Sequence, residues 1–296
     1  MSTQQGLVVA THGRHCVVET ISGERVICHP RGKKSQVVVG DQVLWQASKD
    51  EGTIEQVQER RNLFYRQDEI RTKSFAANLD QILILIAAEP EFSEMQLTRA
   101  LIAAQAQHIL PIIALNKRDL SASFEPAWLR LATYRDMGYT VLPLALKQHD
   151  LGELTGLLAH KTTLVLGPSG TAKSTLINCL HPQANVLTAE ISQALNSGKH
   201  TTTATHWYWV DKEQHTALID SPGFQEFGLH HIEAMQLAQL MPDLKAHASD
   251  CKFYNCSHLH EPQCGVRAAL ELGAISASRY KLYGLLFEEL SQHRHY

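Results

Sequence analysis

The sequence predicts a multidomain α/β protein with an N-terminal OB-fold β-barrel, a doubly wound α/β domain and a C-terminal metal-binding domain that contains a helix. Three observations support this. Short apolar runs with frequent turn residues fill the start of the chain, unbroken apolar strands alternate with helical patterns after residue 80, and Cys and His cluster near residue 260. The expected segments are a barrel over 1–65, a linker over 66–79, the α/β domain over 80–229 and the metal-binding and helical domain over 230–296.

The barrel is predicted from short strand-like runs that turn signals such as Ser22-Gly23 and Gly40-Asp41 separate. This spacing favours an OB-fold, and an SH3-like barrel is the alternative. Basic residues gather at Arg31, Lys33 and Lys34, in keeping either with phosphate contacts or with an ordinary solvated surface.

The α/β domain is predicted from Ile82–Ile86, an unbroken apolar run typical of a buried parallel strand. A helix over 94–107 should follow it. Further strands are expected over 109–115, 140–144, 163–166 and 216–219. Ligands of such sheets bind at the carboxyl ends of the strands, where Asn116, Gly167 and Asp220 stand.

A phosphate-binding loop is predicted between a strand and a helix, with Lys173 reaching phosphates and Ser174 holding Mg²⁺. A plain Gly-Ser turn is the alternative. The residues assigned to this loop are Gly167, Pro168, Ser169, Gly170, Thr171, Ala172, Lys173, Ser174 and Thr175. Ala172 stands where the G-x-x-x-x-G-K-S pattern has glycine, and its methyl group is expected to weaken nucleotide binding by crowding or straining the loop.

Guanine specificity is predicted from Asn116-Lys117-Arg118-Asp119, in which the Asp119 carboxylate would accept the guanine N1 and N2 protons. This motif precedes the phosphate loop, whereas ordinary GTPases place it after. The pattern therefore predicts a circularly permuted P-loop GTPase domain that binds GTP or GDP. In Asp220-Ser221-Pro222-Gly223, Asp220 would hold Mg²⁺ through water and the Gly223 amide would meet the γ-phosphate.

A γ-phosphate-sensing switch is expected at residues 198–203, where Thr202 would complete the Mg²⁺ shell. Phe224 follows Gly223 where many GTPases have a water-orienting glutamine, and a phenyl ring cannot polarise water. His200 is the candidate catalytic group, since imidazole accepts a proton near neutral pH. Whether His200 acts directly or a partner supplies the catalytic group stays open.

A structural zinc site is predicted from Cys251, Cys256, His258 and Cys264, a Cys₃His set suited to tetrahedral Zn²⁺. His260 is the rival imidazole. The net charge is −3, and no stretch reaches the roughly 18 apolar residues of a membrane span. We therefore expect a soluble cytoplasmic protein whose six cysteines are thiols or metal ligands.

Together these motifs resemble the ribosome small-subunit-dependent GTPase family RsgA, also called YjeQ. The resemblance also rests on Ala77-Asn78-Leu79-Asp80-Gln81 and Glu226-Phe227-Gly228-Leu229. It implies GTP hydrolysis stimulated by the small ribosomal subunit, a late role in maturation of that subunit, and rRNA binding. His200 and Thr202 match the family's switch positions. Leu144-Ala145 stands where the family usually has Ser-Ala beside the guanine. Leu144 departs from that pattern, and Ala145, which matches it, is the residue assigned to the base contact.

Two other functions are compatible with parts of the sequence. A non-enzymatic RNA-binding assembly factor would follow if Ala172 cripples the nucleotide site. A P-loop metabolite kinase would leave Asn116–Asp119 without a role, and no acceptor-binding motif supports it. An asymmetric ribosomal site would favour a monomer.

Overall fold

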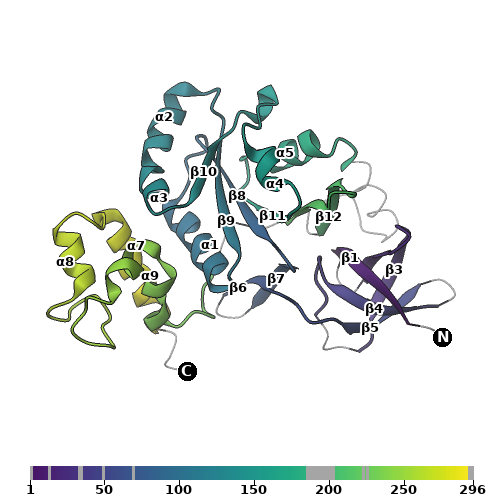
Figure 1. Ribbon diagram of the computed structural model, residues 1–296, viewed down its shortest axis with the longest axis horizontal. Coiled ribbons are helices and arrows are strands. Elements are labelled where there is room, and N and C mark those ends of the chain that lie inside the picture. The colour runs from purple at the N-terminus through teal and green to yellow at the C-terminus, as the bar shows by residue number, and fades with distance from the viewer. Residues whose placement is uncertain are drawn as a thin grey trace.

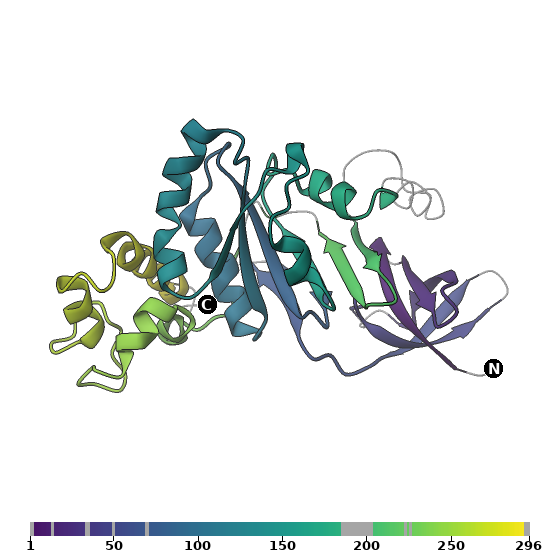
Figure 2. The ribbon, with the colours of Figure 1, turned by 45° about the horizontal axis from the view of Figure 1, so that its top comes forward.

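The computed structural model describes residues 3–12, 15–32, 36–48, 51–68, 71–184, 204–221, 224 and 227–292. The α/β domain lies in the middle of an elongated molecule, with the β-barrel at one end and the C-terminal helices at the other (Figures 1 and 2). The fold class predicted from the sequence is confirmed, including a closed five-stranded barrel at the N-terminus.

The barrel consists of β1 (Gln4–His12), β2 (His15–Thr20), β3 (Arg25–Pro30), β4 (Gln42–Ala47) and β5 (Gly52–Val57). The strand order is β1-β2-β3-β5-β4, and β1 pairs with β4 to close the barrel. β3 and β5 run parallel, whereas the other barrel pairs are antiparallel. A closed five-stranded barrel with this order is the OB arrangement, so the SH3-like alternative is wrong.

The inside of the barrel is filled by small and β-branched side chains around one large ring. Val8, Val18, Cys28 and Val43 pack with Trp45, and all are buried. β1 also pairs with β12 (Thr205–Asp211) of the α/β domain through Ala10 and Thr11. The barrel and the central sheet therefore form one continuous hydrogen-bonded sheet.

The α/β domain is built on the strand order β10-β9-β8-β11-β13-β12. Its strands are β8 (Gln81–Ala87), β9 (Leu110–Asn116), β10 (Thr140–Pro143), β11 (Thr162–Leu166), β12 and β13 (Thr216–Asp220). All neighbours run parallel except β12, which is antiparallel to β13. The carboxyl ends of β9, β11 and β13 therefore meet at one edge, as the sequence predicts.

Helices cover both faces of this sheet. Alternate residues of its central strands point to opposite sides, so each face has apolar side chains that pack against helices. Ile82 and Ile84 of β8 belong to the same core as α1 (Glu94–Ala106), α2 (Ser121–Arg130) and α3 (Ala132–Asp136). Leu83 and Leu85 pack instead with α4 (Leu154–Leu158) and α5 (Lys173–Leu180). A short 3-10 helix, η1 (Leu146–Gln148), follows β10.

The segment predicted as a linker contains regular structure, which is a correction to the sequence-based prediction. β6 (Leu63–Gln67) and β7 (Thr72–Ala77) form an antiparallel hairpin. Phe64 and Phe75 of this hairpin are buried against Phe227, with ring centroids 5.5 and 5.9 Å from it. Burial of these rings explains why the segment folds onto the α/β domain instead of remaining a bare connection.

The C-terminal domain comprises η2 (Ala234–Leu240), α7 (Pro242–Ala248), α8 (Gly265–Glu271) and α9 (Ala277–Gln292). Arg279 of α9 is almost fully buried and joins this domain to the α/β domain. Its guanidinium donates to both Asp243 carboxylate oxygens at 2.8 and 3.1 Å and to Thr98 Oγ1 of α1 at 2.8 Å. None of the helices in the described ranges is both long and apolar enough to cross a membrane.

Candidate nucleotide and metal sites

The phosphate loop joins the end of β11 to the start of α5, so its backbone amides lie at a helix N-terminus. Gly167 is required at the start of the loop, because a Cβ there would lie 2.3 Å from the Leu85 carbonyl oxygen. Thr171 is buried and donates from Oγ1 to the Pro168 carbonyl at 2.9 Å. The loop is therefore braced before any ligand binds.

Ala172 takes a left-handed backbone conformation, with φ at 75° and ψ at 37°, directly before α5. A side chain with a Cβ is strained in this region, whereas glycine adopts it freely. This conformation supplies a physical reason for the glycine of the common motif. The strain lies in the loop itself and is present without any nucleotide.

Replacing Ala172 with glycine is expected to raise the free energy of unfolding by about 1 kcal/mol, because the left-handed conformation then costs no Cβ clash. GDP should also bind more tightly, since the loop can approach the phosphates without the methyl group. Chemical denaturation and a fluorescent GDP titration measure the two effects. An unchanged or lower stability of Ala172→Gly would contradict this account.

Asn116 connects the two predicted nucleotide loops. Its side chain is buried, Nδ2 donates to the Thr171 carbonyl at 3.0 Å, and Oδ1 accepts from the Leu146 amide at 3.1 Å. The guanine motif, the phosphate loop and the segment after β10 are thus held together by one side chain. The sequence assigned Asn116 to the nucleotide site without indicating these two partners.

The other residues predicted to contact guanine lie at the same edge of the sheet as Asn116. Lys117 has a left-handed backbone, with φ at 71°, and its Nζ donates to the Glu89 carbonyl after β8. Asp119 is exposed. Ala145 is buried and exchanges backbone hydrogen bonds with Asp150 at 3.1 and 3.2 Å. The Glu89 carbonyl is a contact that the sequence did not predict, because it belongs to the backbone and carries no motif.

Asp220 ends β13 beside β11, and its backbone pairs with Val165 two residues before Gly167. Within the described part of the chain, its buried Oδ1 atom has no hydrogen-bond partner. Burial raises the pKa of this carboxyl, and the Lys173 ammonium opposes that rise. An unpartnered carboxylate oxygen near Lys173 and the exposed Ser174 fits a hydrated divalent cation.

Three predicted site residues fall outside the described ranges: His200, Thr202 and Gly223. Phe224 is described, and its side chain is buried with its ring centroid 6.0 Å from that of Phe227. Its ring therefore packs in the core, where it orients no water.

The four predicted metal ligands come together in the C-terminal domain. One donor atom from each of Cys251, Cys256, His258 and Cys264 lies within 4.8 Å of the others. The Cys251 and Cys264 sulfur atoms are 3.8 Å apart, and His258 Nδ1 lies 3.3 and 3.5 Å from them. Tetrahedral Zn–S and Zn–N bonds of about 2.3 and 2.0 Å require separations of about 3.8 and 3.5 Å. The cluster can therefore hold a metal ion, and His260 is not part of it.

Residues around the cluster hold its loop in place. Glu261 accepts from the Ser257 amide at 2.8 Å and from the Ser257 hydroxyl at 3.0 Å. The hydroxyls of Tyr280 and Tyr283 on α9 donate to the His258 and Ser257 carbonyls, both at 2.7 Å. The sequence pattern does not indicate these two contacts, because hydropathy does not reveal hydroxyl partners.

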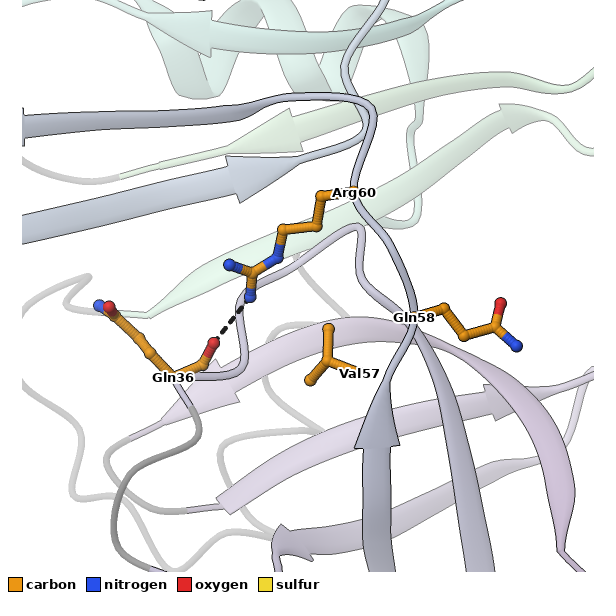
Figure 3. Close-up of a pocket in the computed structure, with 4 residues that line it drawn as sticks. All are labelled: Gln36, Val57, Gln58 and Arg60. Atoms are coloured by element: carbon orange, nitrogen blue, oxygen red, sulfur yellow. Dashed lines mark hydrogen bonds between the residues drawn. The ribbon is translucent and has the colours of Figure 1, made fainter.

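A separate hollow of about 310 Å³ lies on the barrel and is lined by Gln36, Val57, Gln58 and Arg60 (Figure 3). Arg60 donates to the Gln36 carbonyl at 2.7 Å and to the Asp41 carboxylate at 2.6 and 2.8 Å. The charge of Arg60 is thus already compensated. None of these residues carries a nucleotide or metal motif.

Comparisons with known proteins agree with this geometry. A relative from Variovorax paradoxus, named small ribosomal subunit biogenesis GTPase RsgA, is 70% identical over 98% of this chain and 93% of its own length. A relative of the same name from Paraburkholderia phymatum is 50% identical over 97% and 92%. A model of the RsgA GTPase family matches residues 57–230.

Two solved structures share the fold. The crystal structure of YjeQ from Thermotoga maritima has a TM-score of 0.76 and 27% identity, covering 98% of this chain and 99% of that one. YloQ, described as a circularly permuted GTPase, has a TM-score of 0.72 and 28% identity, covering 99% and 96%. Motif order, sheet topology and these relatives lead to one conclusion: the chain belongs to the RsgA family of circularly permuted GTPases.

Proposed function

We propose that this protein hydrolyses GTP during late maturation of the small ribosomal subunit and that the subunit stimulates the hydrolysis. The observation that carries the proposal is the joining of the guanine motif to the phosphate loop through Asn116 in a permuted GTPase fold. The relatives named for small-subunit biogenesis support the choice of partner. A protein with this task would work in the cytoplasm, as a monomer on an asymmetric subunit.

In this proposal each residue of the nucleotide site has a defined task. The Asp119 carboxylate selects guanine, with Ala145 beside the base. The loop amides and Lys173 neutralise the phosphate charge. Ser174, Thr202 and, through water, Asp220 would hold Mg²⁺. The bound ion would supply positive charge to the phosphoryl oxygens. The Gly223 amide would meet the γ-phosphate.

The catalytic proton acceptor has to come from outside position 224, because Phe224 is buried in the core. His200 is the proposed group from this chain, and the ribosome could order it or supply a group of its own. Little turnover by the free protein and strong stimulation by the subunit are therefore expected. This dependence would confine hydrolysis to the assembled complex.

Because of the permutation, the chain that follows Asp220–Gly223 leads directly into the C-terminal domain. The chain after β13 places Phe227 against the β6–β7 hairpin, and the Phe227 carbonyl accepts from Arg99 of α1 at 3.3 Å. Arg99 also forms an ion pair with Glu289 of α9. We propose that loss of the γ-phosphate shifts this segment and with it the C-terminal domain, which Zn²⁺ held by the Cys₃His cluster would make rigid. The barrel and the zinc domain would both contact rRNA.

The test is to measure GTP hydrolysis by the full chain with and without purified small ribosomal subunits, and to repeat it with the Ala172→Gly variant. We expect the subunits to stimulate hydrolysis by the unaltered protein strongly and to give a still higher rate with the glycine variant. Large subunits serve as the control and should not stimulate. Absence of turnover in both variants with small subunits would overturn the proposal, whereas turnover in the glycine variant alone would identify a nucleotide-impaired form.

A further inference from the structure

A buried histidine lies directly beside the proposed magnesium carboxylate. His206 of β12 is paired with Asp220 of β13 in the antiparallel register. Directly opposed residues of such a pair lie on one face of the sheet, with Cβ atoms about 4.5–5.5 Å apart. His206 is only 3% exposed. Its imidazole is thus shielded from solvent on the face of the sheet that also carries Asp220.

Both side chains have a buried polar atom that lacks a partner. Among residues the structure describes, neither His206 Nδ1 nor Asp220 Oδ1 makes a hydrogen bond. Buried polar atoms are almost always satisfied, and these two are not bonded to each other, so a single water between the paired residues is the partner that would satisfy both. Imidazole can donate from Nδ1, and a carboxylate oxygen accepts. Their donor and acceptor roles are therefore complementary.

The electrostatic setting keeps the imidazole neutral. Burial, followed by the charges of His12 and Arg25, lowers the pKa of His206 to about 4. Lys173 is the cation that acts on Asp220. A neutral donor orients a carboxylate without cancelling its negative charge, whereas a lysine or arginine in this place would compete with a bound cation. The arrangement leaves the charge of Asp220 available to Mg²⁺.

The surrounding strands fix this pair. Thr205 Oγ1, from the residue before His206 on β12, and Ser221 Oγ, from the residue after Asp220, lie 3.3 Å apart and are buried. On its other edge, β12 at His206 pairs with Ala10 of the barrel strand β1. The backbone of His206 is therefore held beside that of Asp220 by strands on both of its edges.

We propose that His206 is a positioning residue for Asp220: its imidazole hydrogen-bonds the carboxylate through one water and thereby strengthens Mg²⁺ binding. The inference rests on the proposed nucleotide site. Partners of this kind behind a metal-binding group typically change metal affinity about 10–100-fold when they are removed.

The test is a titration of Mg²⁺ into the full chain in the presence of a fluorescent GDP analogue. The Mg²⁺-free starting sample is prepared without a chelator, so that a bound zinc ion is retained. His206→Phe keeps an aromatic ring but removes the nitrogen atoms. We expect the Mg²⁺ midpoint to rise about tenfold, with GDP binding in the absence of Mg²⁺ unchanged. His206→Gln, which can still donate a hydrogen bond, should recover most of the affinity.

His181 provides a matched control. It is another histidine whose buried Nε2 has no partner within the described ranges, and its ring centroid is 5.9 Å from Tyr208, compared with 6.3 Å for His206. His181→Phe should leave the Mg²⁺ midpoint unchanged. In an Asp220→Asn background, His206→Phe should have little further effect, because both changes remove the same interaction.

Three results would overturn the inference: an unchanged midpoint in His206→Phe, an equal shift in the Asp220→Asn background, or a loss of Mg²⁺-free GDP binding that glutamine does not rescue. The last would indicate a packing role. If the unaltered protein bound no guanine nucleotide, the proposed function would fail as well. Binding with normal Mg²⁺ dependence in His206→Phe would remove this inference alone.

Discussion

Replacing Cys264 with serine is expected to abolish metal binding at the Cys₃His cluster and unfold the C-terminal domain. Structural zinc contributes about 10–16 kcal/mol to the folding of small zinc domains, and we expect a loss of about 5 kcal/mol or more here. Cys264 is buried, and its sulfur also accepts from the Arg267 amide at 3.5 Å at the start of α8. Losing the metal would therefore release both the ligand loop and this helix.

Metal content per chain and thermal unfolding measure this effect, and hydrogen exchange should locate the loss in α7, α8 and α9. Cys179→Ser is the matched control, because Cys179 lies on α5, far along the chain from the four ligands. The control should keep its metal and its stability. Equal metal content and unfolding temperature in the two variants would disprove a structural role for the cluster.

Replacing Lys173 with methionine is expected to lower GTP hydrolysis by at least about 100-fold, since one lost electrostatic contact to a transferring phosphoryl group has an effect of this size. Lys173 opens α5 beside the loop amides and acts electrostatically on Asp220. Without this ammonium group the pKa of Asp220 should rise further. Cation binding at the carboxylate would then weaken as well.

Single-turnover hydrolysis with small subunits and GDP titration measure the two consequences. Lys161→Met is the control, because Lys161 is exposed and directly precedes β11, at the end opposite the phosphate loop. Its hydrolysis rate should match that of the unaltered protein. A Lys173→Met variant that hydrolysed GTP at the normal rate would place the phosphates elsewhere.

Much of the site was predictable because its chemistry is encoded in short segments. The predicted phosphate loop and the Cys₃His set each lie within at most 14 residues, so residue type and spacing indicate them before the fold is known. The apolar run of β8 likewise predicts a buried strand without any partner. His260, the open alternative among the metal ligands, was excluded only by the position of the loop.

The residues that support the site were not predictable, because long-range packing determines their partners. Asn116 reaches Thr171, 55 positions away, only after β9 and β11 have taken their places around β8. Hydropathy marked Phe64 and Phe75 as apolar, yet their burial against Phe227 depends on where the chain after β13 returns.

The sequence by itself determined the motifs, their permuted order and the types of the main elements, since each depends on residues close together in the chain. Only the tertiary structure decided that Ala172 adopts a left-handed backbone, that β1 extends the central sheet and that His206 lies opposite Asp220. Strand register and loop conformation depend on the packing of segments that lie far apart in the chain, and a local sequence pattern does not specify that packing.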